Sequence, residues 1–139
     1  MTNHCLGEGK NMATQVRTDS APTPAGGYSQ ALVVNGLIFT AGMGPIDPAT
    51  GQLVGQDIEE QTSLVLRNLD EVLRAGGSCL ARVVKATVHL ADLADFAVFD
   101  RTYRTLMSEP YPVRTTVGST LPPGMLVEID FVAVVDGDR

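Results

Sequence analysis

The sequence predicts an α+β domain in which a mixed β-sheet carries two helices on one face. Short runs rich in valine and leucine, bounded by Gly, Pro and Asn, are typical of strands. Two longer segments repeat their apolar residues every three to four positions, which is typical of amphipathic helices. The expected order is β-β-β-α-β-α-β-β. Two helices are too few to cover both faces of a sheet, so we expect the other face to pack against copies of the chain in a homo-oligomer.

Size and charge exclude several classes of function. With 139 residues, 44% of them hydrophobic, the chain can build a core without a metal or a disulfide. We expect residues 1–20 to be a flexible tail, because they show no periodicity, and residues 21–136 to form a single domain. The net charge of −6, without a basic cluster, argues against a nucleic-acid partner. No apolar stretch approaches the roughly 18 residues of a membrane span, and the N-terminus lacks a signal-peptide pattern, so we expect a cytoplasmic protein without a membrane partner.

Cysteine and histidine are scarce. Cys5 and Cys79 are too few for a disulfide framework or a zinc site. His4 and His89 leave little from which to build a metal centre or a Ser-His or Cys-His nucleophile pair. We therefore expect no metal and no cofactor. His89 is interpreted as a partly exposed strand residue, and a place in the lining of a site is the less favoured interpretation.

The first predicted strands form a hairpin. An apolar run ends at Val34, an Asn-Gly turn follows at residues 35–36, and a second apolar run covers Leu37–Thr40. Asn and Gly accept the positive φ angles that a two-residue hairpin turn requires, so this is a strong hairpin signal.

Glycines follow this hairpin directly. At Gly42 and Gly44 the backbone can approach a ligand without a Cβ in the way, although a bulge or turn is the simpler interpretation of either glycine alone. An Asp-Pro-x-x-Gly turn then leads into a short predicted edge strand around Gln52–Val54.

The first helix is predicted to begin after Asp57. Asp57 and Glu60 resemble a capping box, and the Gly pair at residues 76–77 supplies a left-handed stop. The apolar residues that recur at helical spacing are Ile58, Thr62, Val65, Leu69 and Val72. The sequence thus gives this helix a start, one apolar face and an end.

A strand and a second helix follow. Arg82–Leu90 alternates between faces, and its predicted inward residues are Val84, Ala86, Val88 and Leu90. Asp92 is the predicted N-cap of the second helix, which ends before Pro110 and Pro112. The residues that this helix is expected to bury at helical spacing are Phe96, Phe99, Tyr103 and Leu106.

The segment Tyr111–Val135 reads as two valine-rich strands separated by a Leu-Pro-Pro-Gly break. Each strand carries a charge where an apolar residue is the default, Arg114 in the first and Glu128 in the second. An unpaired buried charge costs several kcal/mol, so each needs a partner, water or a function. Alternation places Arg114 with Thr116 on one strand face and Glu128 with Asp130 on one face of the other strand. We assign Asp130 to structure or solvent.

Several separated motifs, in order, resemble the Rid family (RidA/YjgF) of reactive intermediate or imine deaminases, part of which carries the name endoribonuclease L-PSP. The motifs are TAGMGPIDPATGQLVG, DLADF and YPVRTT…LPPG…VEID, and the resemblance covers nearly everything from Ala21 to Val135. It implies a chorismate-mutase-like α+β fold assembled as a homotrimer, with three small-molecule sites in the clefts between subunits.

The resemblance also implies roles for individual residues. The ligand-binding arginine of the family falls on Arg114, and its water-associated glutamate falls on Glu128. The site tyrosine matches Tyr28, and the backbone amide that meets the ligand carboxylate matches Gly42. Thr116 stands where the family often has Cys and keeps a hydroxyl near the ligand.

Two further features depart from the family pattern. Ala41 stands where many members have Ser, which removes a side-chain hydrogen bond and bears on substrate preference more than on the reaction. The segment between Arg114 and Leu121 is one residue shorter than the usual pattern, which bears on the register of Glu128.

These residues suit the hydrolysis of a 2-imino acid or enamine to a 2-keto acid and ammonia. The fork of Arg114 can grip a carboxylate together with the N–H of Gly42, while Glu128 positions and deprotonates water or protonates the departing nitrogen. From their positions alone, Arg114 and Glu128 would be interpreted as an ion pair that links strands or subunits. Because both match site residues of the family, we favour roles in binding and catalysis instead. For Tyr28, an equal alternative is that the ring only packs against neighbouring residues while its hydroxyl contacts water.

Other functions stay open at this point. One is a non-catalytic, trimeric regulatory protein that binds a keto acid or amino acid in the same clefts. A second is deamination of a larger enamine such as 2-aminomuconate. Endoribonuclease activity is the least favoured, because the chain is acidic and lacks paired histidines.

Overall fold

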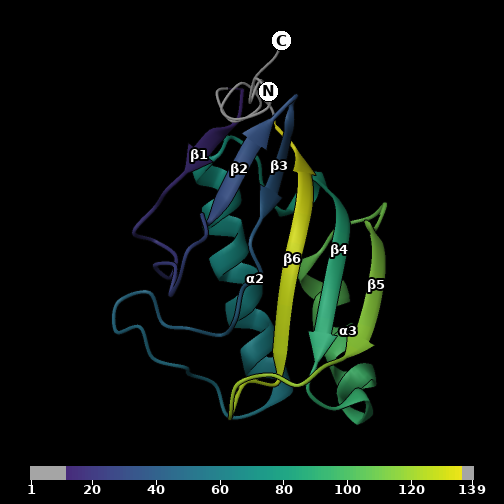
Figure 1. Ribbon diagram of the computed structural model, residues 1–139. Helices are drawn as coiled ribbons and strands as arrows, with labels where there is room; N and C mark the ends of the chain where they lie inside the picture. The colour runs from purple at the N-terminus through teal and green to yellow at the C-terminus, as the bar shows by residue number, and fades with distance from the viewer. Residues whose placement is uncertain (1–11, 136–139) are drawn as a thin grey trace, which may run out of the picture.

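A single six-stranded mixed sheet organises the chain, and the computed structural model describes residues 12–135 (Figure 1). The strand order across the sheet is β1-β2-β3-β6-β4-β5, and β4 with β5 is the only parallel pair among the described strands. The strands are β1 (Thr14–Val16), β2 (Ala31–Val34), β3 (Leu37–Thr40), β4 (Val83–Leu90), β5 (Val113–Gly118) and β6 (Val127–Val134). The helices are α2 (Ile58–Ala75) and α3 (Phe96–Leu106).

The predicted α+β class and element order are confirmed, but the third of the three predicted leading strands is not formed, and an unpredicted strand precedes the hairpin instead. Residues Thr14–Val16, placed in the predicted tail, pair antiparallel with β2, and Val16 is buried. The predicted edge strand around Gln52–Val54 contributes only an isolated bridge between Ile46 and Leu53. The outer edge of β2 is covered by β1 instead, which satisfies backbone groups that would otherwise be unpaired. Residues 1–11 of the predicted tail lie outside the described residues.

The predicted hairpin is confirmed. Asn35 and Gly36 have φ angles of 52° and 75°, the left-handed values that a tight two-residue turn requires. The turn pairs β2 with β3, and β3 in turn pairs with β6. The hairpin therefore sits beside the strand that carries Glu128.

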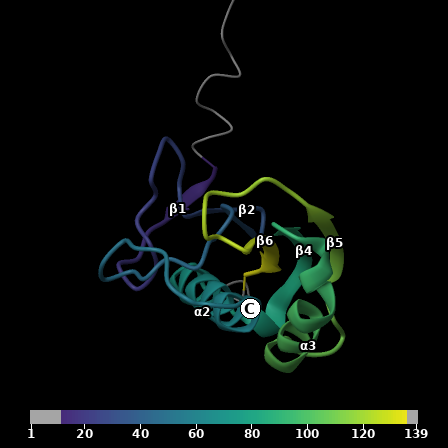
Figure 2. The same cartoon turned by 90° about the horizontal axis from the view of Figure 1, so that it is seen from below.

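Both helices pack on one face of the sheet, as predicted (Figure 2). The Asp57 side chain accepts a hydrogen bond from the N–H of Glu60 at 2.8 Å, and the Glu60 carboxylate accepts one from the N–H of Gln56 at 2.7 Å. Gly77 takes a φ of 88° and ends the helix. The fully buried residues between α2 and the sheet include Ile38, Val65, Leu66, Leu69, Val72, Leu73, Ile129 and Phe131.

The prediction for the aromatic stripe of α3 is right for two residues and wrong for two. Phe99 and Tyr103 are buried, whereas Phe96 and Leu106 are 40% and 43% exposed. The helix α3 lies beside β4 and the edge strand β5 (Figures 1 and 2). Because the sheet ends at β5, no strand covers part of the apolar face of α3.

The alternation predicted for β4 holds only from Ala86 onward. Ala86, Val88 and Leu90 are buried, but Val84 is 43% exposed. The pairing of β4 with β6 shifts register between Val83 and Lys85. On one side of such a bulge, side chains point to the opposite face of the sheet from the one that simple alternation predicts.

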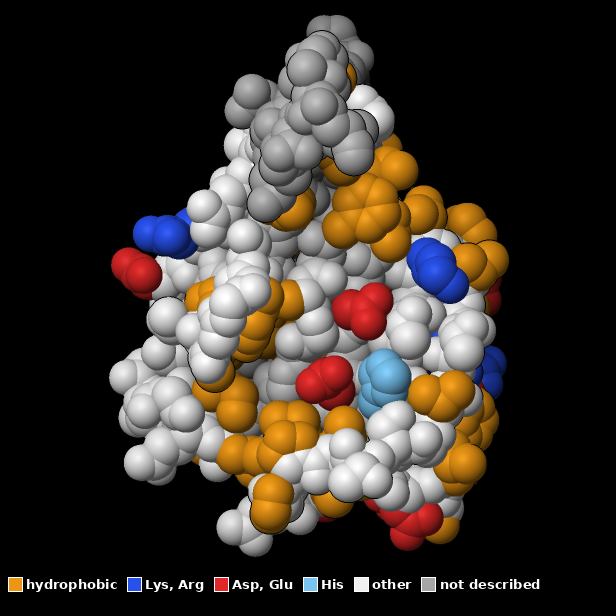
Figure 3. All heavy atoms as spheres, in the orientation of Figure 1, with side chains coloured by type: hydrophobic (Ala, Val, Ile, Leu, Met, Phe, Trp, Pro, Cys, Tyr) orange, Lys and Arg blue, Asp and Glu red, His pale blue; other side chains and the backbone are white. Residues whose placement is uncertain are grey.

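The second face of the sheet has no covering helix among residues 12–135. Exposed apolar side chains on its β2, β3 and β6 strands are Leu32, Phe39 and Val134. Figure 3 shows this face, with acidic and histidine side chains together near its middle and hydrophobic side chains around them. We call it the open face. None of the described helices is both long and apolar enough to cross a membrane.

Candidate functional site

Glu128 lies on the open face in the middle of the sheet. Its neighbours Val127 and Ile129 point into the core and are fully buried, so alternation along β6 turns the carboxylate outward. On the β4 side its cross-strand neighbour is His89, and on the other side the carboxylate lies against the Cα of Gly42. Glu128 makes no hydrogen bond or ion pair within residues 12–135. The half-buried carboxylate is therefore available to water or a ligand.

Gly42 is required by the position of Glu128. A Cβ at residue 42 would lie 2.8 Å from Glu128 Oε2, closer than real side chains approach. Met43 donates to the carbonyl of Ile129 at 2.7 Å and accepts from its N–H at 3.1 Å, which fixes this segment against β6. Gly42 itself is exposed, and its N–H has no acceptor among the described residues. Gly42, whose N–H has no acceptor in the described part of the chain, thus adjoins a carboxylate that has no partner there either.

Gln61 holds the loop that leads into β6. Its buried side chain donates to the carbonyls of Gly124 and Gly55, at 2.8 and 3.1 Å, and accepts from the N–H of Leu126 at 2.7 Å. The hydrogen bonds to Gly124 and Leu126 tie α2 to the segment that leads into β6, on which Glu128 lies. The one to Gly55 ties α2 to the loop before it.

Tyr28 lines the same region as Gly42. Both residues line a cavity of about 340 Å³, bounded mainly by small and apolar residues that include Ala41 and Ile46. Tyr28 is 52% exposed, and its hydroxyl accepts a hydrogen bond from the N–H of Ala25 at 3.1 Å. Tyr28 and Gly42 therefore share one cavity, and Gly42 also adjoins Glu128, which does not line that cavity; we call these three residues the Glu128 half-site.

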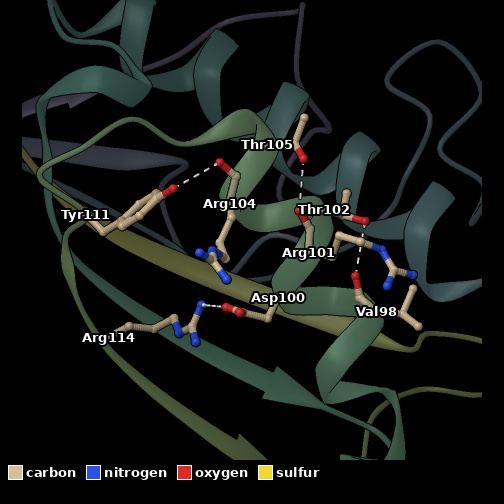
Figure 4. Close-up of polar contacts among 8 residues, drawn as sticks. All are labelled: Val98, Asp100, Arg101, Thr102, Arg104, Thr105, Tyr111 and Arg114. Carbon is tan, nitrogen blue, oxygen red and sulfur yellow. Dashed lines mark hydrogen bonds and ion pairs between the residues drawn. The ribbon is translucent and has the colours of Figure 1, made fainter.

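Arg114 lies on the other face. Its partner in the parallel register is the buried Ala86, so its side chain turns toward α3. Figure 4 shows Arg114 and Asp100 pointing toward one another, and Nη1 donates to Asp100 Oδ1 at 2.8 Å. The guanidinium carbon lies 5.5, 5.6 and 4.8 Å from the ring centroids of Phe96, Phe99 and Tyr103. An ion pair and cation–π contacts therefore orient this arginine, which keeps further N–H donors for a ligand.

Thr116 shares the face of Arg114, because it lies two residues further along β5 and pairs with the buried Val88. We call Arg114 and Thr116 the Arg114 half-site. It lies on the edge strand β5, while Glu128 lies two strands away on the opposite face. The five predicted site residues therefore fall into two groups within one chain. The ion pair considered for the two charges is not formed between them in the chain, since Arg114 pairs with Asp100.

Asp100 and Gln61 were missed by the sequence reasoning. Asp100 lies on α3 between the buried Phe99 and Tyr103, so a carboxylate adjoining an apolar stripe was a signal that it needs a cationic partner. Gln61 gave no comparable signal, because its partners near residue 125 are distant in the sequence.

Burial perturbs two ionisable groups near these half-sites. Burial raises the pKa of Tyr103, Arg114 opposes this, and the buried Tyr103 hydroxyl has no hydrogen-bond partner among the described residues. Burial also raises the pKa of Asp130 on the open face, opposed by His89 and Lys85. No group of three His, Cys, Asp or Glu side chains within residues 12–135 is arranged to hold a metal ion.

The chain is similar to proteins of one family. The sequence profile described as "Endoribonuclease L-PSP" matches residues 18–135. A RutC family protein of Pyrococcus abyssi is 45% identical over 84% of this chain and 92% of its own length. The rat protein named 2-iminobutanoate/2-iminopropanoate deaminase is 38% identical over 86% of this chain and 88% of its own length. The crystal structure of RidA from an Antarctic Psychrobacter superposes with a TM-score of 0.84 at 36% identity, covering 88% of this chain and 99% of that one. The chain therefore belongs to the endoribonuclease L-PSP family, and within it to the Rid proteins.

Proposed function

We propose that this protein hydrolyses reactive 2-imino acids, and the enamines in equilibrium with them, to 2-keto acids and ammonia. The observation that carries the proposal is the Glu128 carboxylate packed against the exposed Gly42, since neither the carboxylate nor the Gly42 N–H has a partner among residues 12–135. A base and an anion donor side by side suit water attack on a C=N carbon next to a carboxylate. The name of the rat relative supports the same class of substrate.

The carboxylate of the substrate is proposed to lie between Arg114 and the N–H of Gly42. A guanidinium grips a carboxylate through charge-assisted hydrogen bonds, each worth about 1.5–3 kcal/mol. Water held by Glu128 then adds to the imine carbon and gives a carbinolamine. That intermediate collapses to the keto acid as its nitrogen leaves with a proton. Addition of water and movement of protons complete this chemistry, so the proposed reaction calls for no redox cofactor.

Arg114 and Glu128 lie on opposite faces of the sheet, so we propose that a second copy of the chain completes each site. The Arg114 half-site of one subunit would meet the Glu128 half-site of its neighbour in a homotrimer. Exposed Leu32, Phe39 and Val134 on the open face support burial against another copy. The proposed oligomer is therefore part of the catalytic hypothesis.

A trapping assay tests this function. An amino-acid oxidase generates 2-iminopropanoate in the presence of semicarbazide, and the protein is added at increasing concentration. We expect the wild-type protein to lower semicarbazone formation, and Arg114→Ala to lose this effect. Arg101→Ala is the matched control, because it removes an exposed arginine that points away from Asp100 on the same helix (Figure 4).

The outcome also separates the remaining functions. If wild-type protein leaves the trapping of several imino acids unchanged, the hydrolytic proposal is wrong. Saturable binding of pyruvate in that same inactive sample would favour the regulatory small-molecule binder.

A further inference from the structure

A histidine and a serine are joined beside Glu128 on the open face. His89 Nδ1 and Ser119 Oγ lie 2.7 Å apart, within hydrogen-bond distance. The backbone N–H of Ser119 donates to the carbonyl of Leu90 at 2.9 Å, so the serine is held at the end of β4. The half-buried imidazole therefore has a fixed orientation, and its second ring nitrogen, Nε2, makes no hydrogen bond within residues 12–135.

His89 is the cross-strand neighbour of Glu128 in the antiparallel register of β4 and β6. Side chains paired in this way have Cβ atoms about 4.5–5.5 Å apart and point to the same face. Figure 3 shows the histidine next to acidic side chains on the open face. Gly42 flanks Glu128 on its other side. A substrate bound by the Gly42 N–H would therefore have both the carboxylate and the imidazole within reach.

Resting on the function proposed above, we propose that the two proton-transfer roles of the reaction belong to two residues. Glu128 is the general base for water, and His89, positioned by Ser119, is the general acid for the leaving nitrogen. Two titratable groups side by side, one a carboxylate and one an imidazole, are suited to opposite roles near neutral pH.

Protons are conserved over the proposed catalytic cycle. As the water oxygen forms its bond to the imine carbon, Glu128 accepts a water proton and the imidazolium of His89 gives a proton to the nitrogen. The proton on Glu128 then passes to His89, and the carbinolamine loses ammonia as Glu128 takes its hydroxyl proton, the imidazolium of His89 gives a proton to the nitrogen, and the C=O bond forms. The proton left on Glu128 returns to His89. Water, imine, keto acid and ammonia are the only species consumed or released.

Titratable and charged groups from the neighbouring strands face His89. Glu128 and Asp130 from β6 contribute two carboxylates, and Lys85 from β4 contributes one ammonium. The segment after β5 contributes the uncharged hydroxyl of Ser119. These groups come from β6, from β4 and from the segment after β5, so the imidazole is surrounded by polar side chains on the open face.

The first test is the pH dependence of kcat in the trapping assay. His89→Gln keeps a side chain that can hydrogen-bond to Ser119 but cannot supply a proton. We expect kcat at about pH 6 to fall roughly 10- to 100-fold, with KM within about twofold. The wild-type kcat should decline as pH rises above neutrality, and this decline should be absent in His89→Gln. A decline caused by ionisation of the imine itself would remain in both proteins.

Two further variants separate a chemical role from a structural one. Ser119→Ala leaves the imidazole in place but unanchored, and it should lower kcat about 3- to 10-fold while retaining the pH-dependent decline. Arg67→Gln, which removes an exposed charge from α2 on the helical side of the sheet, is the control and should leave kcat unchanged. If His89→Gln keeps both the kcat and the pH profile of the wild type, the inference is wrong although the proposed function stands.

A second measurement does not depend on activity. The imidazole of His89 can be titrated by NMR, with its signals assigned by their loss in His89→Gln. In Glu128→Gln the titration midpoint should move to lower pH, because the facing carboxylate no longer stabilises the imidazolium. An unmoved midpoint would overturn the acid–base pair. A wild-type protein inactive on all imino acids would instead overturn the proposed function.

Discussion

Replacing Gly42 with alanine tests whether catalysis depends on the placement of the Glu128 carboxylate. The added Cβ would lie 2.8 Å from Oε2, 3.0 Å from Cδ and 3.3 Å from Cγ of Glu128. Favourable contacts to carbon lie at about 3.5–4.0 Å, so the carboxylate must move away by roughly 0.5–1 Å. The substitution therefore displaces the proposed base without removing it or changing a charge.

The expected effect is large on catalysis and small on stability. A misplacement of about 1 Å can cost about 100-fold in rate, so we expect kcat/KM to fall about 10- to 100-fold. The carboxylate is the flexible end of a half-exposed side chain. We therefore expect the free energy of unfolding to change by no more than about 0.5 kcal/mol.

The semicarbazide assay, run alongside urea unfolding, measures both quantities. Gly27→Ala is the matched control, because a Cβ there would meet no atom within 4 Å. If Gly42→Ala were as active as Gly27→Ala, the placement of Glu128 against Gly42 would not matter to the reaction. A loss of activity accompanied by a large loss of stability would show that the substitution disturbs the fold instead.

Three other predictions concern stability. Gln61→Ala should lower the free energy of unfolding by about 2–4 kcal/mol in urea, because it leaves buried backbone partners unpaired; a change below about 0.5 kcal/mol would contradict the role given to this side chain. Tyr103→Phe removes a buried hydroxyl that has no partner among the described residues, so it should leave stability unchanged or raise it by up to about 1 kcal/mol, and a clear loss would reveal a missed partner. Burial raises the pKa of Asp130, so the native state holds this proton more tightly than the unfolded chain does, and stability falls as pH rises through the range where the carboxyl ionises. Asp130→Asn should accordingly be more stable than wild type at about pH 7 but not at about pH 3, and an equal gain at both would refute the linkage.

Local sequence signals were sufficient for the hairpin and the first helix, but Asp92, the predicted N-cap of the second helix, caps a 3-10 turn at Leu93–Asp95, and α3 begins only at Phe96. Asn35 and Gly36 accept the positive φ angles of the turn, and Asp57 caps the first helix with its own side chain. These features depend on residues a few positions apart, so their physical causes can be read along the chain.

Features that depend on partners distant in sequence could not be predicted in this way. Thr14–Val16 is short and polar, and it becomes a strand because the edge of β2 offers unpaired backbone groups. The bulge that exposes Val84 arises from the pairing of β4 with β6, where Val83 meets Ala133 from a distant part of the chain.

The residue types of the candidate site were identifiable, but their arrangement was not. Alternation groups Arg114 with Thr116, and it places Glu128 outward from β6. It does not say that these groups lie on opposite faces of one sheet. That follows from β5 pairing in parallel with β4, which turns Arg114 toward α3 and Asp100.

The most direct test of a site shared between subunits is complementation between two inactive variants. Arg114→Ala and Glu128→Gln are each purified, then unfolded together in equal amounts and refolded so that their subunits mix. If each site takes Arg114 from one subunit and Glu128 from its neighbour, random mixing restores both residues at about one quarter of the interfaces. The account predicts about 25% of wild-type activity in the mixed sample. Activity no higher than that of either variant alone, in a sample shown to contain mixed oligomers, would contradict it.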